Sequence, residues 1–214
     1  MPVNSIVLKG NLLIPEKAKS IILFSHGGVG GRFSSRNRVV ANDLNKNNVG
    51  TLLFDLLTPD EDICSYSRLD IGLLADRLIA ATEWLKEQEH ADGCRLAYFG
   101  ASTGAAAALK AAVYLPWIAA VVSRGGRPDL AMEVLEEVES PTLLMVGSQD
   151  NEILKLNEKA YALMNCEKRL EVISGATHLF EEPGKMNEVA KMTYAWFEKY
   201  ILSQPVHQDK IIQE

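Results

Sequence analysis

Ser102 stands between Gly100 and Gly104 in the stretch YFGASTGAAAAL, a Gly-x-Ser-x-Gly pattern. It follows a short apolar run that predicts a buried strand and precedes an alanine-rich segment that predicts a helix. In this strand–turn–helix context the pattern is typical of a nucleophile elbow, in which a sharp turn exposes the serine hydroxyl at a helix N-terminus. The alternative is a tight glycine-lined turn that carries no chemistry. We interpret Ser102 as a candidate nucleophile.

A serine hydroxyl needs a base to take its proton, and in proteins that base is usually histidine. The chain has four histidines. His178, in GATHLFEEPG, follows the last predicted strand and precedes the last predicted helix, whereas His90 lies in a charged helix end and His207 in the C-terminal segment. A single loop histidine is more often a surface residue, but the position of His178 fits the base that Ser102 requires.

The acid that orients this histidine is expected between Ser102 and His178 in the chain, at the carboxyl end of a strand. Asp150 follows the apolar run TLLMV and a small turn, and Asp129 follows the preceding strand. Either aspartate also has a non-catalytic interpretation as a helix N-cap. We favour Asp150 and keep Asp129 as the alternative acid, because N-capping alone explains Asp129 well.

Two backbone N–H groups are expected to stabilise the negative oxygen that forms when a serine attacks a carbonyl group. One belongs to Thr103, the residue after the serine. The other is expected in the glycine-rich loop HGGVGG, residues 26–31, at Gly28 or, as second choice, at Val29. Such a loop could also cradle a phosphate, but it lacks the Gly-Lys-Ser/Thr ending and the glycine spacing of nucleotide-binding loops.

Four further residues, His26, Arg32, Arg36 and Arg124, are candidates for substrate binding. His26 closes a predicted strand and opens the glycine-rich loop. The arginines follow that loop or a later strand, so one or two of them could bind an anionic substrate group such as a carboxylate or a phosphate. Salt bridges at helix starts and on the surface explain the arginines at least as well.

These residues require a scaffold that brings strand ends together, and the chain alternates short apolar runs with segments of helical period. The runs, at residues 21–25, 51–54, 96–99, 118–122, 142–146 and 170–173, are mostly continuous, as in parallel strands that are covered on both faces. Helical patterns occupy residues 35–47, 70–88, 102–115, 129–138, 152–165 and 185–201. The alternation predicts an α/β fold with a mainly parallel central sheet and helices on both faces.

At the two ends of the chain the pattern differs. We expect residues 3–14 to form an antiparallel hairpin at one sheet edge, with its turn at residues 9–11. Residues 203–214 are polar and predict a flexible tail. No linker or repeat divides the remainder, so residues 1–202 are expected to form a single domain.

Bulk composition restricts the class of protein. The 214 residues carry a net charge of -6, which argues against a nucleic-acid partner. No apolar run is long enough to span a membrane, and the N-terminal residues do not resemble a secretory signal. The three cysteines are far apart and odd in number, which fits reduced thiols in the cytoplasm better than disulfides. None of them lies in a glycine-flanked turn, so a cysteine nucleophile is not expected.

Five motifs, HGGVGGRFSSRNR, LLFDLLT, YFGASTGAAAAL, VGSQDNEIL and GATHLFEEPG, together resemble the dienelactone hydrolase-like branch of the α/β-hydrolases. The resemblance covers nearly the whole chain and implies an α/β-hydrolase fold with Ser102, Asp150 and His178 as a catalytic triad. Dienelactone hydrolases proper use a cysteine nucleophile, so the serine favours a serine esterase. The stretches VVSRGGRPDL and GASTGAAAA further resemble a bacterial subgroup sometimes fused to phosphoribosyltransferase domains. No transferase motif is present, and no such activity is expected.

The sequence therefore predicts an enzyme that cleaves a small ester, lactone or thioester through an acyl-enzyme, without a metal or organic cofactor. The chain between residues 122 and 150 is too short for a large lid, which favours an open pocket and a small or exposed substrate. A hydrolase fold that serves only as a binding or scaffold module is the alternative, although such a module would not need all three triad residues.

Overall fold

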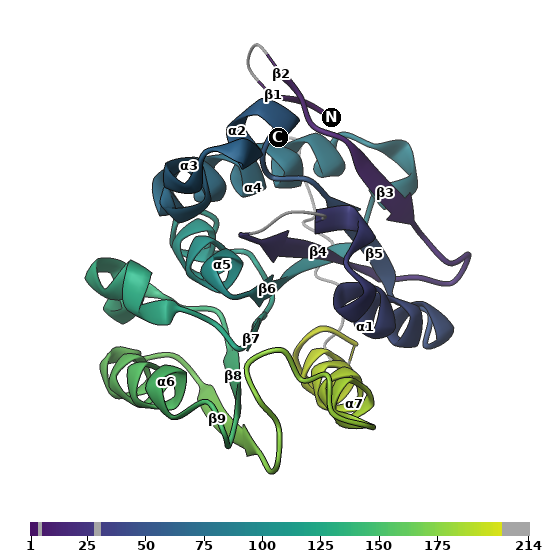
Figure 1. Ribbon diagram of the computed structural model, residues 1–214. Coiled ribbons are helices and arrows are strands. Elements are labelled where there is room, and N and C mark those ends of the chain that lie inside the picture. The colour runs from purple at the N-terminus through teal and green to yellow at the C-terminus, as the bar shows by residue number, and fades with distance from the viewer. Residues whose placement is uncertain (4–5, 28–30, 203–214) are drawn as a thin grey trace, which may run out of the picture.

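A seven-stranded sheet forms the centre of the molecule, with its strands in the order β3-β5-β4-β6-β7-β8-β9 (Figure 1). The computed structural model describes residues 1–3, 6–27 and 31–202. Strand β3 is antiparallel to β5, and the remaining strands of this sheet run parallel. The strands are β3 (Gly10–Leu13), β4 (Ser20–His26), β5 (Gly50–Phe54), β6 (Arg95–Ala101), β7 (Val121–Arg124), β8 (Thr142–Gly147) and β9 (Lys168–Ile173). A separate antiparallel pair, β1 (Pro2–Val3) and β2 (Ile6–Val7), precedes them.

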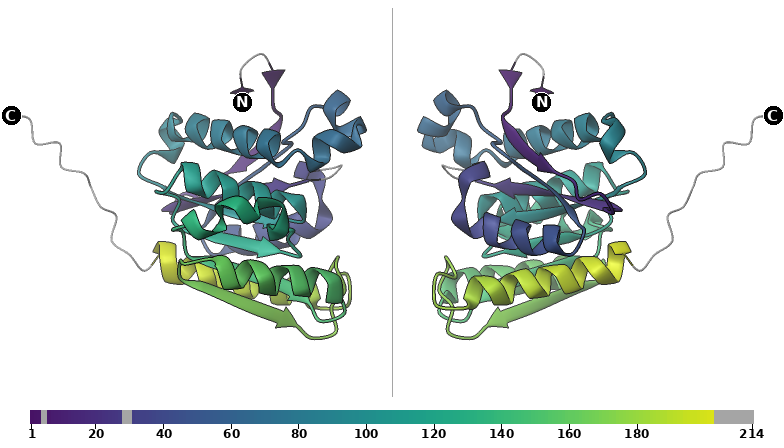
Figure 2. Two further views of the ribbon diagram at one scale, coloured as in Figure 1. Left: turned by 90° about the vertical axis from the view of Figure 1, so that its left-hand side faces the viewer. Right: turned by 90° about the vertical axis from the view of Figure 1, so that its right-hand side faces the viewer.

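Helices cover both faces of the sheet. Figure 1 shows α4, α5 and α6 on one face and α1 and α7 on the other, and the two views of Figure 2 look onto these layers in turn. The long helices are α1 (Ser35–Lys46), α4 (Ile71–Lys86), α5 (Thr103–Tyr114), α6 (Asn151–Leu163) and α7 (Lys185–Phe197). The shorter ones are η1 (Gly31–Phe33), α2 (Pro59–Ile63), α3 (Ser65–Leu69), η2 (Glu89–Ala91), the 3-10 segment η3 (Pro128–Glu137) and the π-helical turn η4 (Glu198–Leu202).

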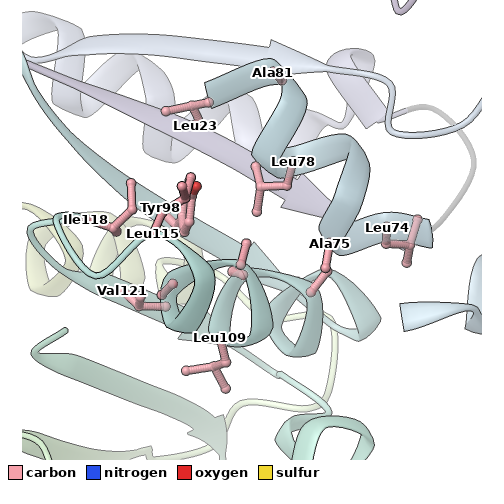
Figure 3. Close-up of a cluster of buried hydrophobic side chains, with 14 of the residues drawn as sticks. Leu23, Leu74, Ala75, Leu78, Ala81, Tyr98, Leu109, Leu115, Ile118 and Val121 are labelled. Atoms are coloured by element: carbon pink, nitrogen blue, oxygen red, sulfur yellow. The ribbon is translucent and has the colours of Figure 1, made fainter. Parts of the chain in front are cut away.

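Each face of the sheet has its own apolar core, because the parallel strands are buried on both sides. On the α4–α5 face, Leu23 and Tyr98 from the sheet pack with Leu78 and Leu109 from the helices (Figure 3). The phenol group of Tyr98 is fully buried, and its oxygen lies 2.8 Å from the hydroxyl oxygen of Thr82, which satisfies a polar group that would otherwise be costly to bury. The alanines of α5 are buried, which explains the alanine-rich sequence: small side chains let this helix approach the sheet closely.

The architecture predicted from the sequence is confirmed, with corrections at particular elements. The turn expected at residues 9–11 is wrong, because Gly10 and Asn11 belong to β3 and pair with β5 at the sheet edge. The strand expected at 118–122 begins only at Val121. The segment expected as a helix at 129–138 is the 3-10 segment η3, and α2 and α3 were not predicted.

Two further expectations from the sequence concern the C-terminal segment and membrane-spanning helices. The C-terminal segment 203–214, expected to be a flexible tail, lies outside the described residues. Within the part of the chain that is described, no helix is both long and apolar enough to cross a membrane.

Candidate active site

The carboxyl ends of β4 and β6 lie side by side, and the chain leaves them toward opposite edges of the sheet. Strand β4 is followed by β5 on one side, and β6 is followed by β7 on the other. In open α/β sheets such a switch point is where ligands bind. A cavity of about 440 Å³ opens at this place. It is lined by His26, Gly27, Gly31, Ser34, Arg36, Asn37, Ser65, Arg68, Leu69, Ala101, Ser102, Thr103, Arg124, His178 and Leu179.

Ser102 occupies a strained turn between β6 and α5. Its φ of 53° and ψ of -127° are unusual for a residue with a side chain, and such conformations persist where the surroundings enforce them. The backbone N–H of Ser102 donates to the carbonyl of Arg124, and its own carbonyl accepts from Ala105 and Arg127. This conformation, with the side chain at the cavity, is the one expected of a nucleophile elbow.

The two glycines of the motif permit this turn. A Cβ at Gly104 would lie 2.4 Å from backbone atoms of His26, and a Cβ at Gly100 would lie 2.5 Å from Cα of Ala105. Helix α5 can therefore start directly against the ends of β4 and β6 only if both positions lack a side chain.

His178 and Asp150 are joined by a hydrogen bond of 2.6 Å between Nδ1 and Oδ2. Asp150 follows β8 and is largely buried, with 14% of its side chain exposed, whereas 40% of the His178 side chain is exposed. Because Nδ1–H donates to the carboxylate, Nε2 of His178 is the nitrogen left to accept a proton. His178 and Ser102 line the same cavity, although no hydrogen bond between them is found among the described residues.

The loop that carries His178 is fixed at both sides of the histidine. The N–H and the hydroxyl group of Thr177 both donate to Glu182, and these bonds hold the pKa of the Glu182 carboxyl below its usual value. Phe180, with a positive φ of 57°, is fully buried in the core beneath. The imidazole is thus held at the cavity by its loop and by Asp150 rather than left to sample solvent.

The other sequence candidates for acid and base lie elsewhere. Asp129 forms a two-pronged ion pair with Arg127, at 2.8 and 2.7 Å, in η3. His90 belongs to η2 and does not line this cavity, and His207 falls outside the described residues. The structure therefore brings Asp150 and not Asp129 to His178.

Only one of the two predicted oxyanion donors can be located. Thr103 is the first residue of α5 and lines the cavity, so its backbone N–H is one of the helix-terminal groups that have no partner within the helix. Gly27 packs tightly on it, since a Cβ there would clash with the Thr103 side chain. Gly28 and Val29 lie outside the described residues.

The candidate substrate-binding residues divide into two groups. Arg32 pairs with Asp55 at 3.1 Å and does not line the cavity. His26 lines the cavity, and its Nε2 donates to the Phe54 carbonyl at 2.8 Å. Arg36 and Arg124 also line it. Burial, reinforced by the neighbouring Arg36, lowers the pKa of Arg124 to about 10.

Comparison with known proteins decides the family. Residues 66–201 match the Dienelactone hydrolase family. The chain belongs to this family. A crystal structure of a dienelactone hydrolase from Anabaena variabilis is 47% identical, with a TM-score of 0.89 over 94% of this chain and 95% of that one. A lidless serine hydrolase from Xanthomonas campestris, 18% identical, shares the α/β-hydrolase fold with a TM-score of 0.74 over 92% and 91% of the two chains.

A longer relative of this dienelactone hydrolase family member bears the name of a phosphoribosyl transferase. It comes from Mycobacterium tuberculosis H37Rv and is 50% identical over 189 residues, which are 88% of this chain. The match covers 43% of the relative, so the chain spans less than half of its length.

Sequence reasoning missed the contribution of α3 to the site of this family member. Ser65, Arg68 and Leu69 of that helix line the cavity. The signal that could have revealed this segment is the capping box of Thr58 and Glu61, in which each residue hydrogen-bonds the backbone N–H of the other and starts α2 just before α3.

Proposed function

We propose that this protein is a serine hydrolase that cleaves a small carboxylic ester through an acyl-enzyme. The observation that carries the proposal is one of arrangement: Ser102 in an elbow conformation and His178 bound to Asp150 line one cavity. Chain order, with the serine first, the aspartate second and the histidine last, matches that of α/β-hydrolases. Lactones and thioesters would react by the same chemistry.

In the acylation step, Nε2 of His178 takes the hydroxyl proton of Ser102 as Oγ attacks the ester carbonyl carbon. The carbonyl oxygen becomes negatively charged and accepts a hydrogen bond from the N–H of Thr103, with a second donor expected at Gly28. Collapse of this intermediate expels the alcohol, which receives the proton from His178. The products are a free alcohol and an acyl group on Ser102.

In the deacylation step, His178 removes a proton from a water molecule, which attacks the acyl carbonyl carbon. The proton then returns to Oγ of Ser102, and the carboxylic acid leaves. Asp150 stabilises the imidazolium ion that forms in each step and keeps Nδ1 protonated. The cavity of about 440 Å³ suits a small substrate.

The alternative function is that of a catalytically silent binding module. The name of the longer Mycobacterium tuberculosis relative favours neither this alternative nor a transferase reaction for this chain. Covalent labelling separates the two classes. We expect a fluorophosphonate probe to label one serine per chain in the wild-type protein and to abolish hydrolysis of p-nitrophenyl acetate. Wild-type protein that is neither labelled nor active would support the binding module instead.

The variant Ser102→Ala assigns the nucleophile. It should lose labelling and lower kcat by at least about 10³-fold, because the attacking atom is absent. Ser174→Ala, which removes an exposed hydroxyl group outside the cavity, is the matched control and should behave as the wild type. Full hydrolysis by Ser102→Ala in pure protein would overturn the assignment.

A further inference from the structure

Arg124 lines the same cavity as the candidate nucleophile Ser102. In the sheet register, His26 of β4 is opposite Ala101 of β6, and Ala101 is opposite Arg124 of β7. Side chains alternate along a strand, so Arg124 shares a face with Val122, which is buried against the α1 and α7 layer. Arg124 is therefore the last residue of the row His26, Ala101 and Arg124 that crosses the carboxyl edge of the sheet. Its strand, β7, is the neighbour of β6, after which Ser102 follows.

The guanidinium of Arg124 is buried without a counter-charge. Arg124 is 6% exposed, and within residues 1–3, 6–27 and 31–202 its guanidinium group has neither a hydrogen bond nor an ion pair. The ring of Phe180 lies against it, with the ring centroid 5.7 Å from the guanidinium carbon. Buried arginines are normally paired with acidic groups, because an isolated charge away from water is unfavourable.

The surroundings of Arg124 are positive as well. Arg36 and Arg68 line the same cavity, each paired with a carboxylate outside it, Glu181 and Asp62 respectively. The described lining includes two histidines and no aspartate or glutamate, in a chain whose net charge is -6. The N-termini of α1 and α5 also reach the cavity and add positive partial charge.

We propose that Arg124, with Arg36 beside it, binds an anionic group, a carboxylate or a phosphate, that the substrate carries close to its scissile bond. The fork of N–H donors on a guanidinium fits either group. Because the backbone N–H of Ser102 bonds the carbonyl of Arg124 and both residues line one cavity, the bound anion would lie within a few bonds of the reacting carbonyl. This inference rests on the proposed function and names the class of ester that the site accepts.

Substrate selectivity tests the proposal. With the anion on the acyl side, kcat/KM is compared for p-nitrophenyl butyrate and p-nitrophenyl hemisuccinate. With the anion on the alcohol side, it is compared for the acetate esters of meta-hydroxybenzamide, meta-hydroxybenzoate and meta-hydroxyphenyl phosphate. We expect the wild-type protein to prefer at least one anionic ester by about ten- to hundred-fold over its neutral partner, as charge-assisted hydrogen bonds allow. The preferred ester distinguishes carboxylate from phosphate.

The variants assign the preference to one side chain. Arg124→Met should reduce the anionic-to-neutral ratio of kcat/KM by at least about ten-fold. Arg124→Lys, which keeps the charge and loses the fork, should recover part of it. Arg169→Met removes one positive charge from β9, far from the cavity, and should keep the wild-type ratio. If Arg124→Met does not fold, as judged by circular dichroism, Arg124→Lys carries the comparison.

The outcomes separate this inference from the proposed function. Equal kcat/KM for neutral and anionic esters, or an unchanged ratio in the Arg124 variants, would overturn it while leaving the serine mechanism intact. If no ester is hydrolysed, the proposed function fails, and calorimetric titration with succinate and with inorganic phosphate still tests the anion site. Saturable binding to the wild type that is lost in Arg124→Met would support the site, and its absence from both would refute it.

Discussion

At the scale of single residues, the pair of His178 and Asp150 makes the clearest prediction. Asparagine in place of Asp150 preserves size but has no negative charge, and its amide can hold the imidazole in the wrong tautomer. We expect Asp150→Asn to fold normally and to lower kcat for p-nitrophenyl acetate by roughly 10²- to 10⁴-fold. Steady-state kinetics and thermal unfolding measured on the same samples check both halves of this statement.

Asp129→Asn is the matched control, because Asp129 is the other sequence candidate for the acid. Its carboxylate is engaged with Arg127 in η3 and has no contact with His178. We expect kcat of this variant to stay within about three-fold of the wild type, since a partly exposed ion pair away from the reacting atoms affects stability more than turnover. A larger loss of kcat in Asp129→Asn than in Asp150→Asn would show that Asp129, and not Asp150, is the catalytic acid.

Local motifs and chain order were enough to predict which residues gather at the site, since Ser102, His178 and Asp150 each follow a strand of one sheet. Pairing between distant residues was not predictable. The sequence makes Arg32, Arg36 and Arg124 equivalent. The fold pairs Arg32 with Asp55 and Arg36 with Glu181, whereas Arg124 has no carboxylate partner in the described part of the chain. That difference depends on which loops meet in space, for which the sequence carries no local signal.

At the scale of elements, two glycines at the same helical position make a matched test. Gly104 and Gly72 are each the second residue of a helix, α5 and α4. A Cβ at Gly104 would lie 2.4 Å from the backbone of His26, whereas at Gly72 the nearest atom, Oδ1 of Asp70, is 3.4 Å away. We expect Gly104→Ala to lower the free energy of unfolding by about 1–3 kcal/mol through overpacking, and with it the hydrolytic activity.

Gly72→Ala should have the opposite sign. Alanine restricts the unfolded chain and favours the helix, so the free energy of unfolding should rise by about 0.5–1 kcal/mol with activity unchanged. Urea unfolding of both variants measures the difference. Equal effects of the two substitutions would show that the contact between α5 and the end of β4 is not tight.

The junction of α2 and α3 carries an exposed thiol whose chemistry depends on these short helices. Backbone N–H groups of Ser67 and Tyr66 lower the pKa of Cys64, whereas burial raises the pKa of Cys94 and Cys166. A lower pKa means more thiolate at a given pH. Iodoacetamide should therefore alkylate Cys64 before Cys94 and Cys166 at pH 7.5, and alkylation of Cys64 should begin at a lower pH than that of the other two. Mass spectrometry of the labelled peptides checks the order, and faster reaction at Cys94 or Cys166 would contradict it.

Long periodic elements were predictable, and short ones were not. The helices of residues 71–86 and 185–197 have continuous apolar stripes, so their existence followed from sequence period alone. Helices α2 and α3 are five residues each and bury no side chain fully, which leaves no stripe to detect. The turn expected at residues 9–11 failed because Gly10 pairs with Phe54, a contact that tertiary structure imposes on a residue typical of turns.

At the scale of the whole molecule, charge is distributed unevenly. The chain has a net charge of -6, yet the described lining of the candidate active-site cavity includes three arginines and no aspartate or glutamate. Asp62 and Glu181 pair with Arg68 and Arg36 from outside the cavity, so the positive groups line the cavity and their counter-charges do not. A buried cation without a partner should therefore cost the free protein stability that a bound anion would restore.

Arg124→Met measures this cost directly. The pKa of Arg124 is lowered to about 10 in the folded protein, below its value in the unfolded chain, so the cost of burying the charged form is fully present below about pH 10 and declines as the pH rises above it. The shift corresponds to an unfavourable contribution on the order of 3 kcal/mol at pH 7. Methionine has a similar length and no charge, so we expect the variant to unfold at higher urea, with a gain of about 1–3 kcal/mol.

Two comparisons make that result specific. Arg169→Met removes a side chain that is 65% exposed and should change the free energy of unfolding by less than about 0.5 kcal/mol. Inorganic phosphate or succinate, whichever the site binds, should stabilise the wild type and leave Arg124→Met unchanged, because only the wild type keeps the cation that the ligand neutralises. A variant less stable than the wild type would mean that the Arg124 guanidinium already has a stabilising partner in the free protein.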